Sequence, residues 1–149
     1  MLFRSQVIAL ILQEGQPKAG VLEALDLIEA QGLKIGLATS SPFAMVEAVL
    51  GKLGIQDRFM AVHSAEVERF GKPHPDVYIH AAEKLGVEPV HCLAIEDSFT
   101  GLLAAKAASM TALIVPDPAL VGDPRLAIAN HELRSLAELN AEMLAGWVK

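Results

Sequence analysis

The chain has 149 residues, enough for one domain and too few for two domains that each bury a core. Hydrophobic residues make up 52% and charged residues 20%, which excludes a disordered chain and suits a sheet buried on both faces. The net charge of −6 excludes a nucleic-acid partner, whose binding needs dense basic contacts, but still allows a small phosphorylated metabolite to bind locally.

The first part of the chain predicts two helices around a short strand. Apolar residues at helical spacing predict a helix over 21–33, and residues 33–38 form a predicted strand that runs into Thr39. Ser41 then gives an N-cap, with Pro42 as the first residue of a second helix. The residues of that second helix expected to face inward are Met45, Val46, Val49, Leu50 and Leu53.

A weaker strand and a third helix follow. Residues 59–62 predict the strand, and a polar loop over 63–72 ends at Lys72. Two prolines on either side of His74 fix the backbone there, and a helix is expected over 75–85. Its apolar side carries Val77, Tyr78, Ala81, Ala82 and Leu85.

The last third of the chain alternates in the same way. Residues 91–95 predict an apolar strand that ends in two adjacent carboxylates, and an alanine-rich helix is expected over 100–110. Another strand is expected over 111–115, followed by a proline-bearing loop over 116–130. The last predicted helix is amphipathic and carries Leu136, Leu139, Met143 and Leu144.

This alternation predicts an α/β fold: a three-layer, Rossmann-like parallel sheet with helices on both faces. Ligands of such sheets bind at the carboxyl ends of the strands. Three polar stretches, at 39–41, 72–75 and 96–98, are expected near those ends. We therefore expect them to converge on one site.

Each polar stretch has a functional and an ordinary interpretation. Thr39 and Ser40 can hold phosphate oxygens at a helix N-terminus, but a Thr-Ser-Ser-Pro turn also simply begins helices. Lys72 can offset charge on a phosphoryl group, although many lysines are solvated surface charges. Glu96 and Asp97 repel one another unless a cation such as Mg²⁺ neutralises them, yet acidic residues also complement a helix dipole.

Taken together, these stretches resemble motifs two, three and four of the haloacid dehalogenase superfamily. The resemblance rests on 36–42, 64–66, 72–78 and 96–98 with Gly101, and it covers most of the chain from about Gln6. These stretches look like those of the subgroup that contains β-phosphoglucomutase and the bacterial sugar phosphatases of hexitol phosphates and 2-deoxyglucose 6-phosphate.

The resemblance implies roles for six residues. Thr39, Ser40 and Ser41 would bind phosphate, Lys72 would neutralise it, and Thr39 and Lys72 would also act in catalysis. Glu96 and Asp97 would bind Mg²⁺, the implied cofactor, and His74 would be a neighbour of the pocket. Residues 21–149 would then form the core domain, with 1–20 as the remnant of the last cap helix and the return into the core.

The chain departs from the family pattern in one respect. The first motif, an apolar strand that ends in Asp-x-Asp-Gly, carries the nucleophile and the acid/base, and the sequence before Thr39 contains neither it nor most of the cap. Gln13 and Glu14 in the apolar stretch 10–15 do not replace it, and Asp117, between two prolines, is a turn residue first. We therefore expect a core without its first strand, inactive alone.

That strand would lie in the sheet between residues 33–38 and 91–95, so its absence leaves two edges without partners. Unpaired buried backbone groups cost ~1–3 kcal/mol each. Three outcomes are possible: rearrangement of the sheet, pairing with another chain or a second copy, or marginal folding.

The expected function is Mg²⁺-dependent hydrolysis of small sugar or polyol phosphates by the complete form. The alternatives are a β-phosphoglucomutase-like phosphotransferase and a non-catalytic phosphate- and Mg²⁺-binding module that complements another chain. A phosphoacceptor receiver is excluded, because its acidic group precedes the hydroxyl and the lysine. Nucleotide-binding G-x-x-x-x-G-K-[ST] and G-x-G-x-x-G motifs are not found.

The sequence also predicts a cytoplasmic protein without a membrane partner. The single cysteine, Cys92, lies in an apolar run, where we expect a buried, reduced thiol. The apolar stretch 7–12 ends too early for a signal peptide and has no cleavage site after it. No run approaches the ~20 apolar residues of a membrane span.

Overall fold

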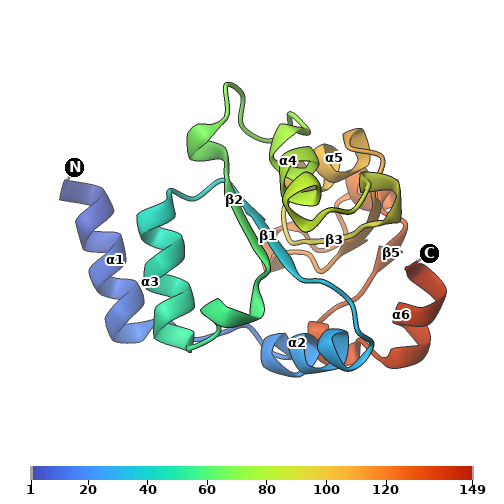
Figure 1. Ribbon diagram of the computed structural model, residues 1–149, viewed down its shortest axis with the longest axis horizontal. Helices are drawn as coiled ribbons and strands as arrows, with labels where there is room; N and C mark the ends of the chain where they lie inside the picture. Colours follow the sequence, from blue (N-terminus) through green and yellow to red (C-terminus); the bar gives the residue numbers. More distant parts are fainter. Residues whose placement is uncertain (1, 149) are drawn as a thin grey trace.

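The computed structural model describes residues 2–148, with side chains from Arg4 onward, and is an α/β domain (Figure 1). Among these residues, no helix combines the length and apolar character needed to cross a membrane. The main elements are α1 (Leu2–Glu14), α2 (Val21–Ala30), β1 (Gly36–Thr39), α3 (Phe43–Leu53), β2 (Ala61–Ser64), α4 (Asp76–Leu85), β3 (Leu93–Glu96), α5 (Phe99–Ala107), β4 (Thr111–Ile114), β5 (His131–Glu132) and α6 (Ala141–Trp147).

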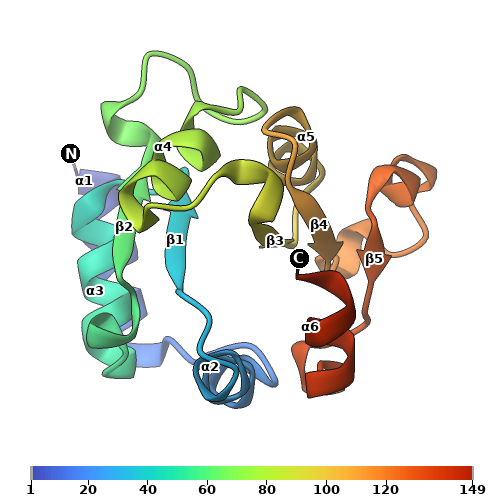
Figure 2. The ribbon, with the colours of Figure 1, turned by 45° about the vertical axis from the view of Figure 1, so that its right-hand side comes forward.

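The strands form two parallel sheets rather than one. In the first sheet β1 pairs with β2, with Gly36 opposite Ala61. In the second, the order is β3-β4-β5, with Leu93 opposite Thr111. Within residues 2–148 no strand joins β1 to β3, and their ribbons stand apart in Figure 2. The expected parallel sheet is therefore present but divided where the missing strand was expected, without a rearrangement that pairs β1 with β3.

Helices cover both faces and connect the two sheets. On one face, β3 and β4 direct Ala94, Ala112 and Ile114 into a core formed with α4 and α5. On the other face, alternate strand residues such as Leu113 pack against α2 and α6. α2 also contributes Leu25 to the core that it forms with α3 and β1, so it spans both sheets (Figure 2). Strand alternation thus produces the predicted three layers.

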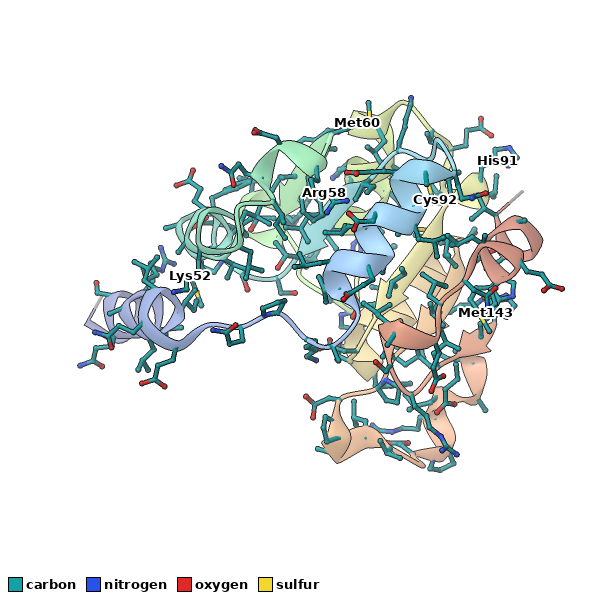
Figure 3. All side chains as sticks on the ribbon, turned by 90° about the horizontal axis from the view of Figure 1, so that it is seen from below. Lys52, Arg58, Met60, His91, Cys92 and Met143 are labelled. Atoms are coloured by element: carbon teal, nitrogen blue, oxygen red, sulfur yellow. The ribbon has the colours of Figure 1, made fainter. Side chains whose placement is uncertain are left out.

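The N-terminal helix lies outside these layers. α1 runs beside α3 at the edge of the molecule, and side chains project from all around it in Figure 3. Lys52 of α3 points toward α1 there, and its Nζ donates to the carbonyl of Leu12 at 2.7 Å. The helix agrees with the expected helical start of the chain, whereas the assignment of 1–20 to a cap stays a prediction.

Several predicted boundaries were wrong by one to three residues. Pro42 is itself the N-cap of α3, because its ψ of 150° is extended, so the helix begins at Phe43. β2 begins at Ala61 and leaves Met60 exposed, and Val49 of α3 is also exposed. β3 begins at Leu93, two residues later than predicted, and includes Glu96. Short 3-10 turns also lie within the expected loops, at 65–67, 118–120 and 124–128.

The C-terminal region differs most from expectation. The two-residue strand β5 falls just after the expected loop and was not predicted. α6 is shorter than the predicted last helix: Leu136 begins a separate 3-10 turn and Leu139 follows that turn. All the same, Leu139 and Leu144 are buried as expected. Cys92 is half-buried rather than buried, and burial raises the pKa of its thiol.

Candidate active site

The six predicted site residues line one cavity of about 850 Å³ at the carboxyl ends of β1 and β3. Thr39, Ser40 and Ser41 come from the turn after β1, and Lys72 comes from the loop before α4. Glu96 ends β3 and Asp97 follows it. The cavity lies between the two sheets, so the divided sheet and the predicted site share one space.

The turn after β1 is held by its own hydroxyls. The backbone amide of Ser41 donates to Thr39 Oγ1 at 3.0 Å. Ser64 Oγ, at the end of the neighbouring strand, donates to the Ser41 carbonyl at 2.6 Å. The first amide of α3, that of Phe43, donates to Glu66 Oε2 at 2.9 Å. Glu66 therefore caps the helix, and the turn presents Ser40 at the exposed side.

Lys72 links the two sheets. Its Nζ donates to the Ala38 carbonyl of β1 at 3.2 Å and to Glu96 Oε1 of β3. The Ile35 carbonyl accepts from Met60, next to β2, so alternation along the strand turns the Ala38 carbonyl away from β2. Lys72 thus satisfies a carbonyl on the open edge of β1. Its side chain is only 10% exposed, so the alternative interpretation of Lys72 as a solvated surface charge is wrong.

Tyr78 is a second partner of Glu96. Its Oη donates to the same Oε1 atom that Lys72 contacts, and the ammonium lies 4.7 Å from the centre of its ring. Burial, followed by the charge of Glu96, raises the pKa of Tyr78 far above its usual range, so the phenol stays protonated and donates. Tyr78 was expected only as a core residue, but a buried tyrosine hydroxyl needs a polar partner, and that need could have revealed this role.

The start of α5 is shaped around Glu96. Ser98 is the N-cap and accepts from the Gly101 amide at 3.0 Å, and its hydroxyl lies 3.3 Å from Glu96 Oε2. A Cβ atom on Gly101 would lie 2.1 Å from the Glu96 carboxyl group. Only glycine leaves room for the carboxylate there.

The two adjacent carboxylates have different surroundings. The side chain of Glu96 is 7% exposed, because Glu96 is part of the strand and faces Lys72 and Tyr78. The side chain of Asp97 is 52% exposed and pairs with Lys18 at 2.7 Å. This oxygen-rich pair fits a hard cation such as Mg²⁺, which takes one or two carboxylates and completes its shell with water and phosphate.

Other residues lie differently from expectation. His74 is not among the described residues that line the cavity, and its Nδ1 lies 3.1 Å from Asp76. Asp117 is the expected turn residue, accepting from the Ala119 amide at 3.1 Å. Lys18 and Arg134 also line the cavity, and sequence reasoning missed both because no local pattern marks them.

Comparison with known proteins gives the family. The model of the haloacid dehalogenase-like hydrolase family matches residues 2–109. The chain belongs to this family. The expected resemblance to this family is therefore confirmed.

Similar haloacid dehalogenase-like proteins point to the expected subgroup. Hexitol phosphatase B of Escherichia coli O157:H7 is 47% identical over 91% of this chain and 62% of its own length. β-Phosphoglucomutase from Clostridium difficile has a TM-score of 0.81 at 29% identity, over 93% of this chain and 60% of its own. CbbY from Rhodobacter sphaeroides, solved with phosphate, has a TM-score of 0.83 at 29% identity, over 94% of this chain and 63% of its own.

The chain thus spans about three-fifths of the length of these haloacid dehalogenase-like relatives. The fold prediction is confirmed by the parallel strands, the helices on both faces and the likeness to these structures.

Proposed function

We propose that this chain is the phosphate- and Mg²⁺-binding part of a phosphatase that acts on small sugar or polyol phosphates. The observation that carries the proposal is the convergence of hydroxyls, the buried Lys72 ammonium and two carboxylates on a single cavity at the carboxyl ends of parallel strands. The similarity to hexitol phosphatase B supports a polyol or sugar phosphate as the substrate class.

In this proposal one group of residues binds the phosphate and another binds Mg²⁺. Thr39 and the Ser40 backbone bind its oxygens, with Ser41 beside them, and Lys72 neutralises it. Glu96 and Asp97 hold Mg²⁺, which supplies electrostatic stabilisation of the charge on the phosphoryl oxygens. Tyr78 orients Glu96 by donating to one of its oxygens, and this leaves the other oxygen, Oε2, on the side of Ser98.

The chain alone is proposed not to turn over. Among the residues that line the cavity in the described part of the chain, the carboxylates are Glu96 and Asp97, and both are assigned to Mg²⁺. An aspartyl-phosphate mechanism needs a further carboxylate to attack phosphorus. A phosphotransferase of the β-phosphoglucomutase type needs the same group, so the choice between hydrolase and mutase lies outside this cavity.

Calorimetry with Mg²⁺ and inorganic phosphate tests the binding roles. We expect phosphate to bind the purified chain in the presence of Mg²⁺ and this binding to weaken at least ~10-fold in Asp97→Asn, the equivalent of about 1.4 kcal/mol. Asp57→Asn changes an exposed acidic residue outside the cavity and is the matched control. Equal binding in both variants would contradict the metal role of Asp97.

Within residues 2–148 no strand pairs with the facing edges of β1 and β3, which favours a second candidate, a module that complements another chain. A segment with an apolar strand that ends in Asp-x-Asp-Gly, added in trans, should then produce Mg²⁺-dependent phosphate release from hexitol phosphates. The release should be lost in Lys72→Ala. If the lone chain released phosphate and this activity disappeared in Lys72→Ala and Asp97→Ala, the proposal that the lone chain is inactive would be refuted. The same result would support the assigned site residues.

Light scattering tests self-association, in which a second copy covers the open edges of β1 and β3.

A further inference from the structure

Two histidines and a glutamate meet at a place separate from the cavity. His63 lies on β2, Glu68 lies just after the 3-10 turn Ala65–Val67, and His80 lies on α4. Their potential ligand atoms all lie within 4.8 Å of one another. None of the three lines the cavity between the sheets. They therefore form a distinct cluster of one carboxylate and two imidazoles.

One carboxylate oxygen is shared by both rings. Glu68 Oε1 contacts His63 Nε2 and lies 2.6 Å from His80 Nδ1. The hydrogen bonds from His63 and then His80 hold the pKa of Glu68 below its ordinary value, so the carboxylate is charged at neutral pH. The Glu68 carboxylate and the His63 side chain are each 7% exposed, whereas the His80 side chain is 41% exposed. The cluster is closed on the inside and open at His80.

His63 has an incomplete set of partners in this arrangement. Its Nδ1 is buried and, within the described residues, finds no hydrogen-bond partner. A buried histidine that makes only one hydrogen bond is costly to place in a core for packing alone. Valine or isoleucine would fill a strand position without that cost, so packing alone does not explain a histidine at this position. The other ring nitrogen, Nε2, faces the Glu68 carboxylate and is the atom available to a ligand in this cluster.

We propose that His63, Glu68 and His80 bind a transition-metal ion of the Zn²⁺ class, with an outer position left for water. Two imidazole nitrogens and one carboxylate oxygen are ligands that Zn²⁺ accepts, whereas Mg²⁺ prefers oxygen throughout. Zn²⁺ bonds of about 2.0–2.2 Å at tetrahedral angles separate ligand atoms by roughly 3.3 Å. Glu68 Oε1 lies closer than this to both imidazole nitrogens. When the ion replaces the protons of these hydrogen bonds, the carboxylate therefore has to move away from the two rings by about 1 Å.

The ion would fasten the segment that leads to Lys72. Glu68 lies four residues before Lys72, between β2 and α4, and the intervening Phe70 is half exposed. With Zn²⁺ bound, this segment is tied to both elements at once. The role is structural and does not depend on phosphate, on Mg²⁺ or on catalysis.

Calorimetry with Zn²⁺ in excess Mg²⁺ tests the site on the purified chain. We expect one equivalent of Zn²⁺ to bind and to raise the unfolding temperature, and Co²⁺ to give the visible absorption of a four-coordinate ion. His80→Gln should weaken Zn²⁺ binding at least ~10-fold, and so should Glu68→Gln. His80 is partly exposed, so its replacement leaves the fold intact, which circular dichroism checks.

His91→Gln is the matched control. His91 is exposed and lies beside Cys92 at the outside of the molecule (Figure 3), where Zn²⁺ can bind adventitiously. Binding that persists in His80→Gln and disappears in His91→Gln would overturn the proposal. So would the failure of Zn²⁺ to bind below ~100 μM with Mg²⁺ present.

Limited proteolysis gives an independent readout. Trypsin cleaves after Arg69, next to the exposed Phe70, whereas the bond after Lys72 leads into proline and resists cleavage. Zn²⁺ should slow cleavage at Arg69 at least ~5-fold in the unmodified chain and in His91→Gln. No protection is expected in His80→Gln, which also controls for direct inhibition of trypsin. Equal protection in all three would show that the ion does not act through this cluster.

Discussion

The two sheets bury their apolar residues to different extents. In the β3-β4-β5 half, Leu102, Leu113 and Ile114 are fully buried, at 0% exposure. In the β1-β2 half, the buried apolar residues such as Ile35 and Leu50 keep 7–8% exposure. A two-stranded sheet is marginal by itself, and β1 has an open edge. The β1-β2 half therefore depends on α2, on α4, which packs against β1 and β2 as well as the other core, and on Lys72.

The largest expected difference lies in the two cores. Leu113→Ala should lower the free energy of unfolding by about 4 kcal/mol, because it leaves a cavity in a fully closed core. Leu50→Ala, the same change in the other half, should cost about 2 kcal/mol, since Leu50 keeps 7% exposure, borders a cavity and has neighbours that can adjust. Urea unfolding measures both, and equal costs would remove the distinction between the halves.

The next largest effect concerns the link between the halves. Lys72→Met should cost about 3 kcal/mol, because it leaves the buried carboxylate of Glu96 without its cation. Lys18→Met breaks the exposed pair with Asp97 and should cost under about 1 kcal/mol. In the double variant Lys72→Met with Glu96→Gln, part of the loss should be recovered. Purely additive costs would show that Lys72 does not act through Glu96.

A pair of glycines sharpens the comparison at the helices. Gly101→Ala should cost ~1–3 kcal/mol and weaken Mg²⁺ binding, since its Cβ overlaps the Glu96 carboxyl group. Gly51→Ala, in α3, meets nothing within 4 Å and should stabilise by ~0.5–1 kcal/mol. Thermal unfolding and Mg²⁺ titration report the two effects, and a neutral Gly101→Ala would contradict the tight fit.

The smallest expected effect is a pH dependence of the β1-β2 half. The hydrogen bond to Glu68 raises the pKa of His80 above its ordinary 6.5, so this stabilisation is complete below about 6.5 and is lost as the pH rises through the raised value. The pKa of Glu68 is lowered from 4.5, so its contribution is present above about 4.5 and is lost as the pH falls through the lowered value. The contact should therefore stabilise most between about pH 4.5 and 6.5.

Urea unfolding with a chelator present, at pH 5.5, 7 and 8.5, checks this expectation. Stability should fall by at most ~1 kcal/mol toward pH 8.5, as for other partly exposed ion pairs. His80→Gln should flatten the difference, and His91→Gln should leave it unchanged. An unaltered pH profile in His80→Gln would assign the dependence to other groups.

Much of the fold was predictable because it depends on local patterns. Alternation of apolar strands with amphipathic helices located β1, β3 and β4 and the ends at which polar residues gather. Thr39 and Asp97 lie at or just after the ends of predicted strands and Lys72 lies in the loop before a predicted helix, and the family resemblance grouped the three at one cavity. Local patterns do not predict contacts between residues that are far apart in the sequence, such as the ion pair of Lys18 with Asp97, 79 positions away.

Other features escaped prediction for physical reasons. β5 has two residues, too few for any period to be visible. The unequal burial of Glu96 and Asp97 depends on whether the strand ends at Ile95 or one residue later, and sequence-based boundaries are not that precise. The His63, Glu68 and His80 cluster draws on three elements whose approach only the fold defines.

The hydrogen bond from Lys72 to the Ala38 carbonyl would couple the pairing of another strand with β1 to the binding of an anion in the cavity. A strand arriving beside β1 would offer its own amide to that carbonyl and so release the ammonium toward an incoming anion. Thermodynamic linkage makes the effect mutual: an anion that attracts the ammonium leaves the carbonyl open and favours the arriving strand. Completion of the sheet and loading of the pocket would then be cooperative.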